Sequence, residues 1–304
     1  MSEVNLNHRG YQCPPLDLLN GHVPIFCSKQ FQNNAMELPC AIGTTEDNET
    51  FMFDLTNVHH LLVAGATGQG KTACLNAIIC SLLLKKTPSE LQLVLVDPKV
   101  CEFKIYAPLY NIFLKERPNG IVYDYDHCLS VIDSLRSLME HRYYRLKEAN
   151  VRYITEYNQK HPEKPMPYIL TVIDEYSDLL MVLGREFESK LSNLAAHSWR
   201  MGIHFVISTQ RPTTNIITCW IKANFPARIA FRIPARCRSN TIIDCGGAEC
   251  LNGNGDMLVR LDSSGPVHIQ GAYIENKEIE RIVSYIAQQR NYDRKTSDIT
   301  TCKE

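Results

Sequence analysis

The hydrophobic positions of the chain form two kinds of pattern, short continuous runs and longer segments with helical spacing. Short apolar runs bounded by turn residues predict buried strands at 60–65, 91–97, 168–175, 203–209 and 227–233. Longer segments with apolar residues at helical spacing predict helices at 71–86, 125–150, 187–202 and 276–290. Because helices separate the strands, we expect an α/β fold with a mostly parallel sheet and helices on both faces.

Shorter apolar stretches flank this alternating region. Residues 38–55 combine such stretches with turn signals and predict a β-hairpin leading into the core. The runs at 255–261 and 266–274 predict a second hairpin or an edge pair. In the last helix, Asn276 is the candidate N-cap.

The two ends of the chain lack this periodicity. Residues 1–35 are rich in Asn, Pro and other polar residues, which predicts a partly ordered N-terminal arm, a small extension of the core. The segment 291–304 is polar and is expected to be a flexible tail. We therefore expect one domain at 36–290.

The octet GATGQGKT follows the first strand of the alternating region and precedes a helix. A tight glycine-rich turn points backbone N–H groups at phosphates, and the helix N-terminus adds positive charge. Lys71 would reach the β- and γ-phosphates, and the Thr72 hydroxyl would hold Mg²⁺. This pattern predicts a nucleoside triphosphate site made by Gly65, Ala66, Thr67, Gly68, Gln69, Gly70, Lys71, Thr72 and Ala73.

A second part of this site is predicted at the ends of two later strands. Asp174 and Glu175 end one apolar run, which suits Asp174 to the Mg²⁺ shell through water and Glu175 to activating water against the γ-phosphate. Gln210 follows the next strand and is a candidate γ-phosphate sensor. With no NKxD segment to read guanine, the nucleotide is expected to be ATP, hydrolysed for mechanical work.

Composition narrows the setting. The chain has 304 residues and a net charge of −1, so overall charge does not point to nucleic acid. Its 12 cysteines form no CxxC pair and no zinc-finger spacing, as expected of reduced thiols. The start carries no signal-peptide pattern, and the longest apolar run, 73–84, is too short to span a bilayer. We expect a cytoplasmic protein that reaches a membrane only through a partner.

Basic residues are concentrated in one part of the sequence. Between Ser189 and Ile243 there is no Asp or Glu. Such a span suits either contact with a phosphate backbone or contact with a neighbouring subunit's nucleotide. A solvated surface is the alternative, although solvated surfaces usually mix charges. The basic residues of the span are Lys190, Arg200, Arg211, Lys222, Arg228, Arg232, Arg236 and Arg238.

Several segments, in this order, resemble the motor of the FtsK/SpoIIIE family of DNA translocases over about residues 36–290. They are HHLLVAGATGQGKT, VLVDPK, VRYITEYN, TVIDEYSDLL, MGIHFVISTQRPTTNIITCWIKANFPARIAFRI and GNGDMLV with GPVHIQGAYI. The resemblance implies a RecA-like P-loop ATPase core and a hexameric ring. It also implies double-stranded DNA moved through the ring by ATP hydrolysis with Mg²⁺.

The resemblance assigns roles to several basic residues. Arg211 in TQRP and Lys222 in IKAN match positions that face DNA. Arg236 matches a residue that senses the nucleotide of the neighbouring subunit. We expect Arg238 to contact DNA as well, because Asn240, two residues later, replaces an Arg that has this role in the family.

One position of the family pattern concerns the arginine finger, which acts in trans on the neighbour's nucleotide. Trp199 stands where the family has this Arg, and Arg200 follows it. We expect Arg200 to serve as the finger after a shift of one residue. The sequence leaves open whether Arg200 or Arg236 makes this contact.

The leading hypothesis is an ATP-driven double-stranded DNA translocase, for chromosome segregation or mobile-element transfer. The membrane region and winged-helix domain of the family's cell-division members are not expected in a chain of this length. An alternative is a secretion-type ATPase that moves protein with a related core. A third reading, a ring that binds ATP without hydrolysing it, is disfavoured by Glu175 and Gln210.

Overall fold

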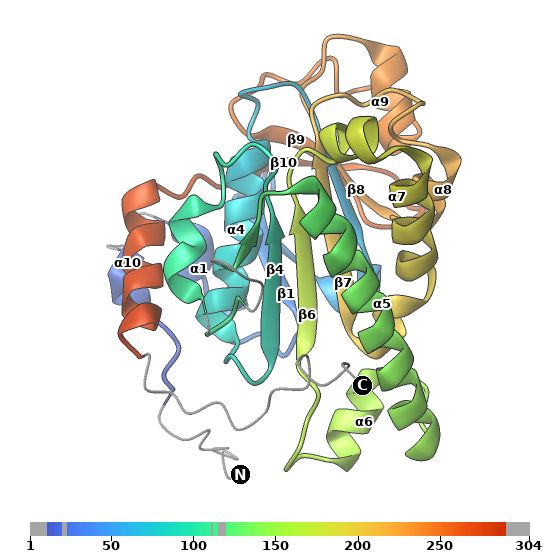
Figure 1. The fold of residues 1–304 in the computed structure, drawn as a ribbon. Coiled ribbons are helices and arrows are strands. Elements are labelled where there is room, and N and C mark those ends of the chain that lie inside the picture. Colours follow the sequence, from blue (N-terminus) through green and yellow to red (C-terminus); the bar gives the residue numbers. More distant parts are fainter. Residues whose placement is uncertain (1–10, 20–22, 111, 115–119, 290–304) are drawn as a thin grey trace.

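A computed structural model describes residues 11–19, 23–110, 112–114 and 120–289. Its centre is one ten-stranded sheet with the order β2-β1-β10-β9-β8-β3-β7-β6-β4-β5, seen nearly edge-on in Figure 1. Helices cover both faces, which confirms the α/β fold expected from the sequence.

Six neighbouring strands run parallel and four run antiparallel. The parallel strands are β8 (Ala227–Phe231), β3 (Leu61–Ala64), β7 (Ile203–Thr209), β6 (Tyr168–Ile173), β4 (Leu91–Val96) and β5 (Ile121–Val122). The antiparallel strands are β9 (Asp256–Arg260), β10 (Val267–Gly271), β1 (Pro39–Thr44) and β2 (Thr50–Asp54). Both predicted hairpins are present, as β1–β2 and β9–β10.

Two apolar clusters pack on opposite faces of the sheet, because successive side chains of a strand alternate in direction. Leu61 and Val63 belong to one cluster, and Leu62 and Ala64 to the other. The first face carries α4 (Lys71–Lys85), α10 (Asn276–Gln288), α1 (Pro24–Cys27), α2 (Lys29–Gln32) and α3 (Leu55–Val58), with the 3₁₀ turns η1 (Leu16–Leu19) and η2 (Lys104–Leu109). The second carries α5 (Tyr125–Glu148), α7 (Tyr176–Ser198), α8 (Cys219–Asn224) and α9 (Arg236–Ile243). The short helix α6 (Ile154–Lys160) and the turn η3 (Trp199–Met201) complete the fold.

The described part of the N-terminal arm packs on this core. Leu19, Phe26 and Phe31 are fully buried in the same apolar cluster as α4. The boundary at residue 35 stays a prediction, although apolar packing continues across it. The predicted tail at 291–304 lies outside the described residues.

Two sequence predictions need correction. The helix expected at 187–202 begins at Tyr176, and a break at Gly184, with φ 68° and ψ −157°, divides it. Because the break at Gly184 interrupts the helical spacing of apolar residues, the sequence pattern did not predict the first two turns. The N-cap of the last helix is Glu275 rather than Asn276, because Glu275 and Glu278 form a capping box.

Across the described residues, every helix is either too short or too polar to cross a bilayer.

Candidate nucleotide-binding site

The glycine loop lies between the end of β3 and the start of α4. Gly70 has a φ of 118°, and a Cβ there would lie 2.9 Å from the Cα of Gly255. The Gly255 N–H also donates to the Gln69 carbonyl at 3.1 Å. Only glycine fits at position 70, because both its backbone conformation and its neighbour exclude a side chain.

Lys71 reaches back across this loop. Its Nζ donates to the carbonyl oxygens of Gly65 at 3.0 Å and Ala66 at 2.8 Å. Burial lowers the pKa of Lys71, and the nearby carboxylates of Glu175 and Asp174 oppose that shift. The ammonium group is thus held where a phosphate on the loop would meet it.

Asp174 follows β6 and is buried beside the end of β7. Ser208 donates its hydroxyl hydrogen to Asp174 Oδ1 at 2.5 Å and accepts the Glu175 N–H at 3.2 Å. Burial raises the pKa of Asp174, and the charges of Asp97 and Glu175 act in the same direction. A bound cation would relieve this crowding of carboxylates.

Glu175 has an unusual backbone, with φ 50° and ψ 59°, and its side chain is about 2% exposed. Its Oε1 accepts from the Ser177 hydroxyl, from the Thr209 hydroxyl at 3.3 Å and from the Gln210 N–H at 3.1 Å. Its Oε2 is buried, has no hydrogen-bond partner among the described residues and lies 3.5 Å from Lys99 Nζ. One oxygen is therefore fixed by hydrogen bonds, while the other is held by the Lys99 ion pair alone.

Gln210 joins the two halves of the site. Its Oε1 accepts from the Thr67 hydroxyl of the glycine loop at 2.6 Å. Its backbone N–H is bonded to Glu175 as described above. The side chain of the proposed sensor thus contacts the glycine loop, and its backbone N–H contacts the proposed base.

Two site residues were missed in the sequence. Asp97 ends β4, beside Asp174, and its buried Oδ1 has no hydrogen-bond partner among the described residues. The run LQLVLVD ends in an acid just as YILTVID does, and that signal could have identified it. Lys99 forms ion pairs with Glu175 and Asp178.

The oxygens near the loop are suited to Mg²⁺. Hydroxyl and carboxylate oxygens are the donors this ion prefers, and Thr72, Asp174 and the unpaired Asp97 oxygen supply them. Among the described residues, the acids, histidines and cysteines form no group of three arranged to hold a metal alone.

The basic residues of the acid-free span divide between the two ends of the parallel strands. Arg236 and Arg238 lie on α9 and Arg211 follows β7, at the carboxyl end of the sheet where the glycine loop lies. Arg200 precedes β7, at the opposite, amino end. The span therefore does not form one continuous basic surface.

Several of these cations are already paired. Lys222 Nζ pairs with Asp244, which also binds Arg228 and Arg260. Arg236 lies 3.9 Å from Glu249, and its side chain is 79% exposed. Arg211 is exposed, and its guanidinium contacts Met181 Sδ at 3.2 Å.

A sheet whose central strand feeds a glycine loop, with acids ending the strands β6 and β4, defines a RecA-like P-loop ATPase core. A family model described as FtsK/SpoIIIE family matches residues 23–214, and the chain belongs to that family.

Curated relatives agree with this assignment. The DNA translocase FtsK of Chlorobaculum tepidum is 43% identical over 266 residues, which cover 86% of this chain and 33% of that protein. The DNA translocase FtsK of Treponema pallidum is 39% identical over 260 residues, covering 84% of this chain and 32% of that protein. The chain thus spans about a third of the length of these relatives.

Solved structures support the fold. The pCW3 conjugation coupling protein TcpA, in its monomer form with ATPγS, matches with a TM-score of 0.75 and 26% identity, over 86% of this chain and 73% of that chain. The cytoplasmic domain of the type VII secretion ATPase EccC of Thermomonospora curvata matches with a TM-score of 0.69 and 20% identity, over 82% of this chain and 31% of that chain. The second likeness concerns the fold alone.

Proposed function

We propose that this chain is the ATP-hydrolysing motor of a double-stranded DNA translocase. The observation that carries the proposal is the convergence of the glycine loop, the acids after β6 and Gln210 on one point of the sheet. Relatives named DNA translocase FtsK and a conjugation coupling protein favour DNA as the load.

Each side chain has a proposed role in ATP hydrolysis. Lys71 and the loop N–H groups bind the phosphates. Thr72 and Asp174 would hold Mg²⁺, Asp174 through water, and the bound ion would supply positive charge to neutralise the phosphates. Glu175 accepts a proton from the attacking water, and Gln210 contacts the γ-phosphate as a sensor.

The load is proposed to pass through a ring of copies, expected to be hexameric. Arg211, Lys222 and Arg238 are the proposed DNA contacts, and Arg200 or Arg236 is the proposed contact to the neighbour's nucleotide. Of the three proposed DNA contacts, Arg211 and Arg238 are exposed, which leaves their charges accessible to phosphate. We place the motor in the cytoplasm, with membrane contact only through a partner.

The test is the ATPase rate with and without linear duplex DNA, measured alongside the mass of the assembly. We expect DNA to raise the rate at low salt, and the rise to shrink as salt increases. Lys71→Ala should abolish turnover in both conditions. If the assembly has the mass of a ring and its ATPase rate does not change when DNA is added at low salt, the DNA proposal is contradicted. That result favours the protein-moving alternative.

A further inference from the structure

His59 lies in a strained turn immediately before β3. Its φ is 66° and its ψ is −66°, and the His60 N–H closes the turn by donating to the Val58 carbonyl at 2.8 Å. This is γ-turn geometry of a kind that residues with side chains rarely adopt. Such strain persists only where the surroundings hold it, and it concentrates at functional sites. The His59 ring is therefore a candidate for a functional role.

Two buried histidines hold this turn. His204 donates from Nδ1 to the His59 carbonyl at 2.7 Å. The His60 ring donates from Nε2 to the Ala195 carbonyl at 2.8 Å and accepts the Phe205 N–H at 3.0 Å. These bonds tie the turn to the last part of α7 and to β7. The same two elements flank η3, the turn that carries Trp199 and Arg200.

The turn places the His59 ring flat against Trp199. The two ring centroids lie 3.7 Å apart with an interplanar angle of 19°. The Arg200 guanidinium lies over the Trp199 ring, 5.1 Å from its centroid, in a cation–π arrangement. Burial and the charge of Arg200 lower the pKa of His59, so the stack is not opposed by a second positive charge near neutral pH.

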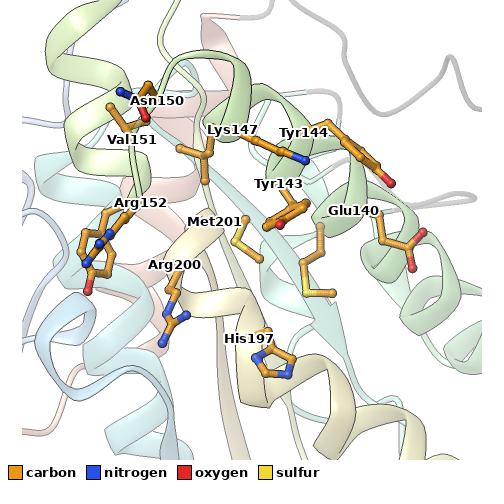
Figure 2. Close-up of a pocket in the computed structure, with 13 residues that line it drawn as sticks. Glu140, Tyr143, Tyr144, Lys147, Asn150, Val151, Arg152, His197, Arg200 and Met201 are labelled. Atoms are coloured by element: carbon orange, nitrogen blue, oxygen red, sulfur yellow. The ribbon is translucent and has the colours of Figure 1, made fainter.

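Arg200 itself is exposed at the rim of a groove of about 800 Å³. Figure 2 shows Arg200 and His197 on one side, with Tyr143 and Lys147 of α5 on the other. No carboxylate of the described residues lies within ion-pair distance of Arg200, and its guanidinium lies over the Trp199 ring. The groove thus presents a cation that its own chain leaves unneutralised.

Arg200 cannot serve its own glycine loop. His59 and Gly65 lie at opposite ends of β3, and six extended residues span about 20 Å. That distance exceeds the length of an arginine side chain. A nucleotide that Arg200 contacts would therefore belong to another molecule, docked at the amino end of the sheet.

We infer that His59 is a positioning residue, whose strained turn and ring stack fix Trp199 so that Arg200 reaches the nucleotide of a second copy of this chain. The inference rests on the proposed ring and ATPase activity. It assigns the trans contact to Arg200, and it gives Trp199 the role of a platform for the neighbouring guanidinium. Loss of the His59 ring should misplace the charge without removing it.

Four variants of the full chain, assembled with duplex DNA, test the stack. Arg200→Ala should lower kcat by about 10³-fold. His59→Asn, which tolerates the turn but removes the ring, should lower kcat by about 10- to 100-fold with KM for ATP and assembly mass unchanged. His59→Tyr, which keeps a ring, should retain kcat within a fewfold. His141→Ala removes an exposed ring on α5 that lies outside both the stack and the groove lining, and should leave kcat unchanged.

A mixing experiment tests whether the contact is made in trans. Arg200→Ala and Lys71→Ala should each be inactive alone. Mixed rings should regain turnover, because a Lys71→Ala subunit can offer its intact Arg200 to a neighbour with an intact loop. The inference is overturned if the mixed rings do not regain turnover, or if the His59→Asn chain keeps the wild-type kcat. In either case, turnover by the wild-type chain would still support the proposed ATPase activity. A wild-type chain without any turnover overturns both.

Discussion

At the carboxyl end of the sheet, polar side chains of the site bond to one another, whereas at the amino end the Arg200 guanidinium lies over an aromatic ring and has no carboxylate partner among the described residues. Glu175, Gln210 and Thr67 are linked by hydrogen bonds that run from one strand end to the next. Around Arg200 the bonds fix the backbone and the rings and leave the charge itself unpaired.

This difference indicates which parts of the site one chain can complete. Hydrogen bonds at the carboxyl end hold the proposed base before any ligand arrives, although Asp97 Oδ1 and Glu175 Oε2 have no hydrogen-bond partner among the described residues. Such an arrangement favours catalysis by preorganisation. An exposed cation on a fixed aromatic ring costs little free energy, because water solvates it. It stays accessible to negative charge that a partner brings. The proposed ring would bring these two ends together across each subunit boundary.

The largest effect is expected from Glu175→Gln at the carboxyl end. The amide can keep the hydrogen bonds of the side chain but cannot accept a proton from water, so kcat should fall by about 10²- to 10⁴-fold while ATP still binds. Single-turnover hydrolysis and nucleotide-binding assays separate the two effects. Glu186→Gln, an exposed acid on the same helix, is the matched control. Turnover that survives in Glu175→Gln would refute the role as base.

Acid should act most strongly on the amino end. Burial lowers the pKa of His60 to about 3 and of His204 to about 4. Because the unfolded histidines take up protons below about pH 6.5 and the folded ones do not, stability falls as pH drops through that value. Each of these two histidines should lower the free energy of unfolding by about 2 kcal/mol at about pH 5.

Urea unfolding at about pH 7 and pH 5 measures this loss. His268 has the opposite sign, because Glu46 and Asp256 raise its pKa, so its contribution is present at low pH and is lost as pH rises. Replacing His60 with Phe should remove about 2 kcal/mol of the pH dependence. An unchanged pH dependence in that variant would show that His60 titrates normally in the folded state.

Local patterns in the sequence predicted the parts of the molecule that depend on local chemistry. The strands, the glycine loop and the acids at the end of β6 each follow from a short run of residue types. The His59–Trp199 stack joins residues 140 positions apart, and no periodicity encodes such a pair. The pairing of Lys222 with Asp244 was missed for a related reason, since Asp244 lies just beyond the acid-free span.

A smaller effect is expected from Ser208→Ala. The hydroxyl bonds both Asp174 and the Glu175 N–H in a buried site, so its loss leaves two polar groups unsatisfied and should cost about 1–3 kcal/mol of stability. Ser192→Ala is the matched control, because the Ser192 hydroxyl is buried and has no hydrogen-bond partner in the described part of the chain. Denaturant midpoints of the two variants give the difference. Equal losses would mean that the Ser208 bonds contribute nothing measurable.

The smallest expected effect separates two proposed DNA contacts within the basic span. Arg211 has no carboxylate partner among the described residues, so Arg211→Ala should weaken duplex binding and lower the salt slope by about 1. Lys222 shares Asp244 with two arginines, and Lys222→Ala should change the slope less. Duplex affinity over a series of salt concentrations measures both slopes, with Lys190→Ala as a paired surface control. Equal slope changes for Arg211 and Lys222 would show that Asp244 releases Lys222 when DNA binds, and that internal pairing does not exclude a residue from the DNA surface.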